Sequence, residues 1–211
     1  MLATDLQRPQ SRSPITYSKV LLVEGRDAFE FSKALLRHLG LLSEIEIRNF
    51  GGLADLADYL EALKVTPGFL GVASLGILRD AEASAGSAFQ SVCNALKRSG
   101  YSVPGQPMAV AEGSPRVSVF ILPDCANPGM LEDLCLQAVA NDPTLACVEQ
   151  YFRCLQEQGV GLPNNVPKAR LHAFLASRPA PDLQLGEAAH RGYWLWDSPA
   201  FDYLKGFLRV L

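Results

Sequence analysis

Short apolar runs alternate with amphipathic segments along the first part of the chain, and this alternation is the feature that most limits the possible folds. The continuous apolar runs at 19–23, 69–78 and 117–122 are typical of strands that are covered on both faces of a sheet. Residues 44–50 alternate apolar and charged side chains and predict a further strand. Because helical segments separate these strands, the pattern predicts parallel strands joined by right-handed crossovers.

The segments between the strands have the spacing of apolar residues that is typical of helices. We expect helices at 27–39, 53–63 and 86–99. A short strand is predicted at 108–111. Beyond the sheet the chain is mostly helical, with helices predicted at 129–141, 144–158, 168–177 and from Ser198 onward.

The pattern divides the chain into three regions. Residues 1–17 mix polar residues with proline and are expected to form a flexible N-terminal tail. Residues 18–124 should form the α/β core. Residues 125–211 should form a mostly helical extension that packs on this core.

The composition excludes several classes of protein. The 211 residues carry a formal net charge of −3, which argues against broad, non-specific coating of nucleic acid. The longest apolar runs are much shorter than a membrane-spanning helix requires, so no membrane partner is expected. The five cysteines form no C-x-x-C pair and are expected to be buried free thiols in a reducing compartment. We therefore predict a cytoplasmic protein.

Carboxylates follow two of the predicted buried strands. Glu24 comes directly after the run 19–23, and Asp80 and Glu82 follow the run that ends at Leu78. Because the carboxyl ends of parallel strands meet at one edge of a sheet, these side chains are expected to converge. Crowded carboxylates repel one another unless a cation neutralises them, and oxygen ligands suit Mg²⁺ or Mn²⁺. The sequence therefore predicts a divalent-metal site and a function on phosphates.

The order strand, Glu-Gly, helix, strand, Gly-Gly, helix, strand, Asp-x-Glu resembles the TOPRIM domain. Glu24-Gly25, Gly51-Gly52 and Asp80-Ala81-Glu82 supply these motifs. The resemblance covers about residues 18–124 and is greatest to the small stand-alone TOPRIM proteins of unknown function, with OLD-type nucleases more distant. Segments 120–124, 129–134 and 207–208 also look like the stand-alone group. The resemblance to TOPRIM implies a TOPRIM-like (Rossmann-like) α/β fold, with about four parallel strands flanked by helices and a helical C-terminal part.

The resemblance also implies roles for the three acids. Glu24 would be the catalytic general acid/base or a metal ligand, and Asp80 and Glu82 would hold Mg²⁺ or Mn²⁺. The implied chemistry is breakage or formation of phosphodiester bonds in nucleic acid, with the metal polarising a phosphoryl oxygen or activating water. Two residues depart from the family pattern. Glu82 stands where Asp is usual, and Ala28 stands just after Asp27, where many relatives carry a further acid, which weakens a second metal site.

Five more charged residues are candidates for a supporting shell around the site: Asp27, Asp124, Glu132, Asp133 and Lys168. Each also has a plainer interpretation. Acids in the first turn of a helix stabilise it through the helix dipole, and Lys168 is also consistent with a solvated surface position. The aromatic segment 193–196 could stack on bases, although core packing is the commoner role of such a segment.

Two other functions remain open. The first is a non-catalytic TOPRIM scaffold that binds nucleic acid, a nucleotide or a partner protein, and the acidic net charge and Ala28 favour it. The second is a flavodoxin-like nucleotide binder, which the lack of a phosphate-cradling loop after the first strand disfavours. The sequence distinguishes neither DNA from RNA nor a homodimer from a protein that works with a separate ATPase partner.

Overall fold

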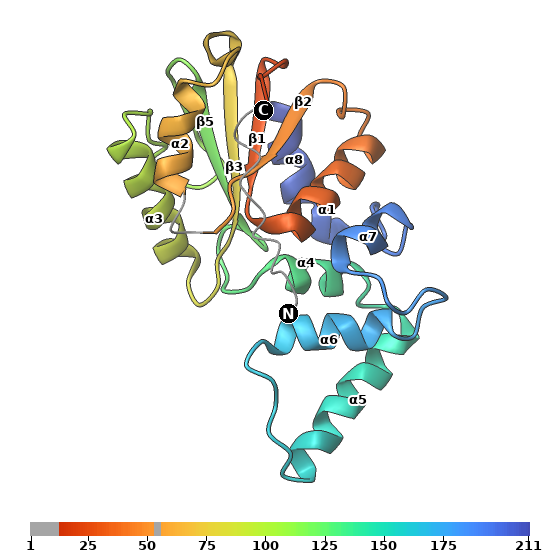
Figure 1. The fold of residues 1–211 in the computed structure, drawn as a ribbon. Helices are drawn as coiled ribbons and strands as arrows, with labels where there is room; N and C mark the ends of the chain where they lie inside the picture. Colours follow the sequence, from red (N-terminus) through yellow and green to blue (C-terminus); the bar gives the residue numbers. More distant parts are fainter. Residues whose placement is uncertain (1–12, 53–55) are drawn as a thin grey trace, which may run out of the picture.

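A mostly parallel sheet forms the centre of the molecule (Figure 1). The computed structural model describes residues 13–52 and 56–211. Within these residues the sheet has five strands in the order β2-β1-β3-β5-β4. Four strands pair in parallel, while the short β4 is antiparallel to β5. The strands are β1 (Lys19–Val23), β2 (Ile45–Asn49), β3 (Ser74–Asp80), β4 (Val110–Ala111) and β5 (Arg116–Leu122).

The mixed α/β class and the four parallel strands were correctly predicted, but the start of the third strand was wrong. The third strand begins at Ser74 rather than at Phe69. Residues Phe69–Gly71 form a short 3₁₀ helix, η2, because Gly68 has a φ of +91° and bends the chain before the strand. The amide of Gly71 then donates to the carbonyl of Gly68 at 3.0 Å.

Helices cover both faces of the sheet, and each face has its own hydrophobic cluster (Figure 1). Helices α2 (Leu56–Lys64) and α3 (Ala85–Arg98) lie on one face. Helix α1 (Gly25–His38) and the last helix, α8 (Asp202–Val210), lie on the other. Both faces are apolar because both are covered, which explains the continuous apolar strands. The first residues of the predicted helix 53–63 lie outside the described residues.

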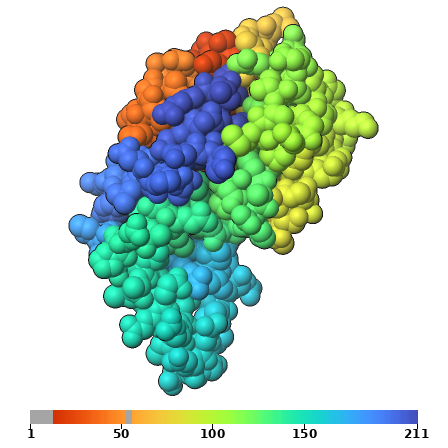
Figure 2. Space-filling model, turned by 180° about the vertical axis from the view of Figure 1, so that it is seen from behind, coloured from red at the N-terminus to blue at the C-terminus, as the bar shows by residue number. Residues whose placement is uncertain are grey.

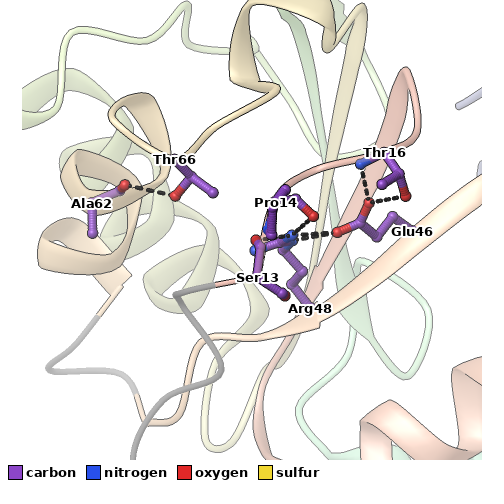
Figure 3. A network of polar contacts seen from close by, with 7 residues as sticks. All are labelled: Ser13, Pro14, Thr16, Glu46, Arg48, Ala62 and Thr66. Carbon is purple, nitrogen blue, oxygen red and sulfur yellow. Dashed lines mark hydrogen bonds and ion pairs between the residues drawn. The ribbon is translucent and has the colours of Figure 1, made fainter.

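The segment 13–17 is docked on the core, although a flexible tail was predicted to extend to residue 17 (Figure 3). The buried guanidinium of Arg48 donates to the carbonyls of Ser13 and Pro14 at 2.8 and 3.1 Å. The carboxylate of Glu46 accepts hydrogen bonds from Thr16 and also pairs with Arg48. Ile15 is buried and donates its amide to the carbonyl of Pro67 at 2.7 Å. Residues 1–12 of the predicted tail lie outside the described residues.

The helices of the C-terminal part share the hydrophobic cluster of the α1 face. Helices α5 and α6 project away from the sheet as a pair, as the views from both sides show (Figures 1 and 2). Helix α7 was not predicted, because its six residues are too few for a clear apolar period. The elements are α4 (Leu131–Ala138), α5 (Pro143–Glu157), α6 (Val166–Leu175), α7 (Leu185–His190) and η3 (Pro199–Phe201), followed by α8.

Several details of this part refine the expectations. Trp194 is buried, so the aromatic segment contributes to the core. Cys93 and Cys135 are buried as predicted, whereas Cys147 and Cys154 are exposed on α5 because this helix projects from the core. In the described residues we find no helix that has both the length and the apolar character needed to cross a membrane.

Helix α4 begins two residues later than predicted, at Leu131. The nearby Asn127 side chain does not cap it and donates instead to Asp124 at 2.7 Å. Two carboxylates take over the capping role. Asp133 accepts a hydrogen bond from the amide of Met130, and Asp80 at the end of β3 accepts one from the amide of Leu131, both at 2.9 Å.

Candidate functional site

Glu24 and Asp80 lie at the same edge of the sheet, on neighbouring strands. Glu24 directly follows β1, and Asp80 is the last residue of β3. The two strands run parallel, with Val23 opposite Leu78. Glu82 follows two residues after Asp80. The chain therefore brings these acids to the carboxyl edge of the sheet, where open parallel sheets carry their ligand sites.

Asp80 is the most deeply placed of the three acids. One carboxylate oxygen accepts the amide hydrogen of Leu131 at 2.9 Å. Burial raises the pKa of Asp80 to about 7, and the negative charges of Glu132, Glu24 and Glu82 add to the rise, although the Leu131 hydrogen bond opposes it. Burial and the nearby acids therefore both disfavour the ionised form of Asp80.

Arg79 supplies one cation on the other face of β3. Successive strand residues point to opposite faces, so Arg79 faces α3 while Asp80 faces α4. The guanidinium donates through Nη1 to the carbonyl of Ala88 at 3.0 Å, and its Nε lies 3.8 Å from Oε2 of Glu24. Burial lowers the pKa of Arg79, while Glu24, Glu82 and Asp80 act to raise it. The sequence interpretation missed this residue; the available signal was a basic side chain between the end of the apolar run at Leu78 and the acid Asp80.

Glu82 presents its side chain to solvent from a fixed backbone. Its φ of 53° lies in the left-handed region that residues other than glycine rarely adopt. Two backbone hydrogen bonds of 2.9 Å, one in each direction, join Glu82 to Gly129 in the loop before α4. The exposed carboxylate is thus carried by a strained loop that is held from both sides.

Glu132 lies near Asp80, and Lys168 and Asp27 lie near Glu132. Burial raises the pKa of Glu132, Lys168 lowers it, and Asp27 and Asp133 raise it further. The carboxylate of Asp27 also accepts the amide hydrogen of Gly186 at 3.1 Å. Helices α1, α4 and α6 therefore each contribute one charged side chain of this group.

Asp124 and Asp133 stabilise the local backbone. Asp124 accepts hydrogen bonds from the amides of Ala126 and Asn127 and from the Asn127 side chain. Burial alone would raise its pKa, but these bonds leave it lowered. Asp133 caps α4 through Met130. These contacts account for both acids without a ligand.

The donor chemistry of the edge fits a hard cation. Its carboxylate oxygens are the ligand type that Mg²⁺ and Mn²⁺ prefer, and the acids Glu132, Glu24 and Glu82 add to the rise in the pKa of Asp80 that burial causes. Among the described residues, no group of three His, Cys, Asp or Glu side chains is arranged to hold a metal ion as it stands. A cation would therefore have to draw the flexible arms of Glu24 and Glu82 towards Asp80.

Comparisons with known proteins complete the description. The family model described as "Protein of unknown function (DUF3226)" matches residues 18–211. No curated protein matches the chain. Among solved structures, the chain is similar to the C-terminal region of the OLD protein of Xanthomonas campestris pv. campestris, with 15% identity and a TM-score of 0.49. The match covers 92% of this chain and 96% of the other.

Proposed function

The chain belongs to the DUF3226 family, and we propose from the acids at the sheet edge that it is a Mg²⁺-dependent phosphoryl-transfer protein, specifically a nuclease. Asp80, Glu82 and Glu24 would hold the cation, Mg²⁺ or Mn²⁺. The observation that carries the proposal is the environment of Asp80, where burial and neighbouring acids raise the pKa to about 7. A divalent cation would relieve this repulsion directly.

Each acid has a position suited to its proposed role. Asp80 is fixed by the amide of Leu131, so it would provide a rigid ligand. Glu82 is exposed on a held backbone and can approach a cation without a change in the fold. Glu24 is half-buried beside Arg79 and would hold or move a proton at the attacking or leaving oxygen. The bound metal would supply the polarisation of a phosphoryl oxygen or the activation of water.

Two further observations support a phosphate substrate. The order of the acidic motifs resembles TOPRIM proteins, and the parallel α/β sheet is compatible with that resemblance. Lys168 on α6 is exposed and lowers the pKa of Glu132, so an ammonium group is available near Glu132. We propose that it contacts a phosphate of the nucleic acid.

A cleavage assay tests the proposal. Purified protein is incubated with single- and double-stranded DNA and RNA, with Mg²⁺, with Mn²⁺ and with chelator. We expect metal-dependent cleavage that Glu24→Gln reduces at least about a hundredfold, the scale of general acid–base catalysis. Glu112→Gln is the matched control, because Glu112 is exposed beyond β4, where the neighbouring Ala111 pairs with Val117 near the start of β5. Cleavage that survives Glu24→Gln would contradict the proposed role.

The Arg79–Glu24 pair favours a second candidate function, a non-catalytic binding module. The pair neutralises one of the acids without any metal, as a purely structural ion pair would. In this case, no divalent ion would give cleavage, and affinity for a nucleic acid, a nucleotide or a partner protein would be unchanged by Glu24→Gln. A homodimer or a separate ATPase partner is compatible with either function.

A further inference from the structure

Arg79 places a buried charge directly beside the acidic edge. Only 7% of its side chain is exposed, and burying a charge costs free energy unless the charge is paired and hydrogen-bonded. The carbonyl of Ala88 on α3 accepts one guanidinium hydrogen bond at 3.0 Å. This contact fixes the position of the cation between β3 and α3.

Glu24 is the carboxylate that Arg79 faces across the strand pair. The Nε–Oε2 separation is 3.8 Å, and 29% of the Glu24 side chain is exposed. Glu24 occupies the capping position of α1, yet its side chain makes no capping hydrogen bond to that helix. In contrast, the side chain of Ser84 caps α3 by accepting from Ser87. The ion pair with Arg79 is thus one contact that orients this carboxylate at the edge.

We infer that Arg79 is a positioning residue: a built-in counter-ion that holds Glu24 at the acidic edge before a metal ion arrives. The inference deepens the proposed function and rests on it, since positioning matters only where the acids act together. Arg79 lies on the opposite face of β3 from Asp80, so it would not contact substrate. It acts through Glu24.

This arrangement has a consequence for metal binding. A guanidinium beside Glu24 competes with a divalent cation for the same carboxylate and repels it at short range. Arg79 therefore stabilises the metal-free state and lowers the affinity for the metal. The conservative variant Arg79→Lys keeps the positive charge. Arg79→Met removes the positive charge but keeps most of the bulk of the side chain.

The first test uses the metal-free protein. The unfolding midpoints of wild type, Arg79→Met, Glu24→Gln and the double variant are compared at pH 8 with chelator, as a double-mutant cycle. We expect Arg79→Met to lower the midpoint and Glu24→Gln to restore part of the loss. Arg48→Met is the matched control, since Arg48 is also a buried strand arginine paired with a glutamate; its effect should simply add to that of Glu24→Gln. Additive effects for Arg79 would overturn the inference.

The second test measures the binding of Mn²⁺ alone by calorimetry. We expect Arg79→Met to bind Mn²⁺ about tenfold more tightly than wild type, because one nearby positive charge is gone. Arg79→Lys should bind like wild type, which a role in packing alone would not explain. Unchanged or weaker binding by Arg79→Met would overturn the inference. If wild type and all variants bind no Mn²⁺, the proposed metal-dependent function fails, and the metal-free cycle alone decides the role of Arg79.

Discussion

Two buried arginines on different strands of the sheet show how similar ion pairs serve different surroundings. Arg48 on β2 pairs with Glu46 and holds the backbone of Ser13 and Pro14, so the segment 13–17 closes over it. Arg79 on β3 faces Glu24, but Asp80 and Glu82 add negative charge next to it. The first pair meets one nearby acid, whereas the second lies in a group of acids with too little positive charge. Excess charge, and not burial alone, distinguishes the candidate site.

The largest effect is expected at Arg48. Arg48→Met would leave Glu46 without its partner and release the carbonyls of Ser13 and Pro14. Removing one partner of a buried pair costs about 3 kcal/mol or more, so we expect a loss of that order in the free energy of unfolding. Denaturant titration measures it. Arg79→Met should cost clearly less, because Glu24 is more exposed than Glu46; an equal or larger loss at Arg79 would break the comparison.

The next effect concerns the charge of Asp80. Its pKa is raised from 3.8 to about 7, so the stability that its protonated form contributes is complete below pH 3.8 and is lost as pH rises through 7. Asp80→Asn has no carboxyl group to ionise, so it should not lose stability over this pH range. Its side-chain oxygen can still accept the amide hydrogen of Leu131. We expect the variant to be more stable than wild type by about 2–4 kcal/mol at pH 8 in chelator, where the upper figure corresponds to the full pKa shift.

Thermal unfolding across pH 4–8 measures this difference, which should shrink towards pH 4. Mg²⁺ should raise the melting temperature of wild type by mass action and leave that of Asp80→Asn nearly unchanged. Equal metal shifts in both proteins would place the cation elsewhere. If Asp80→Asn is less stable than wild type at pH 8, neighbouring groups already compensate the negative charge of Asp80.

A smaller effect is expected at Glu82. Its left-handed backbone costs a residue with a side chain about 1 kcal/mol, and glycine adopts it freely. Glu82→Gly should therefore stabilise the metal-free protein by up to about 1 kcal/mol and reduce the Mg²⁺-dependent shift. Calorimetric melting with and without Mg²⁺ tests both parts. If Glu82→Gly is less stable than wild type, contacts of the Glu82 side chain stabilise the fold by more than its left-handed backbone destabilises it.

The smallest effect on stability is expected at Lys168, which is exposed on α6. Lys168→Met should change the free energy of unfolding by no more than about 0.5 kcal/mol, as for most surface substitutions. If Lys168 contacts phosphate, the same variant should lose affinity for nucleic acid, and that loss should shrink as salt is added. Fluorescence anisotropy at two salt concentrations measures it, and unchanged affinity would remove Lys168 from the site.

The sequence predicted the parts of the fold that depend on local patterns. Continuous apolar runs identified β1 and β5, and the ends of β1 and β3 correctly indicated that Glu24 and Asp80 share one edge. The start of β3 was missed because Gly68 bends an equally apolar segment into η2. The docking of residues 13–17 was missed because it depends on Arg48, which is distant in the sequence.

The site was predictable only in its acids. Their order along the chain is visible in the sequence, and their roles as metal ligands remain predictions. The contribution of Arg79 depends on which face of β3 it occupies and on the position of Ala88. The structural use of Asp124 and Asp133 depends on hydrogen bonds to the backbone of one loop. Neither kind of information is present in the spacing of residues.

The loop before α4 is joined to the acidic edge at two successive points. Gly129 exchanges backbone hydrogen bonds with Glu82, and Leu131 donates to the side chain of Asp80. Because one short stretch of chain is hydrogen-bonded to both residues, the positions of Asp80 and Glu82 are coupled to the position of the start of α4. A displacement of this helix, including one that starts in the projecting α5–α6 pair, would therefore act directly on the segment that carries Asp80 and Glu82.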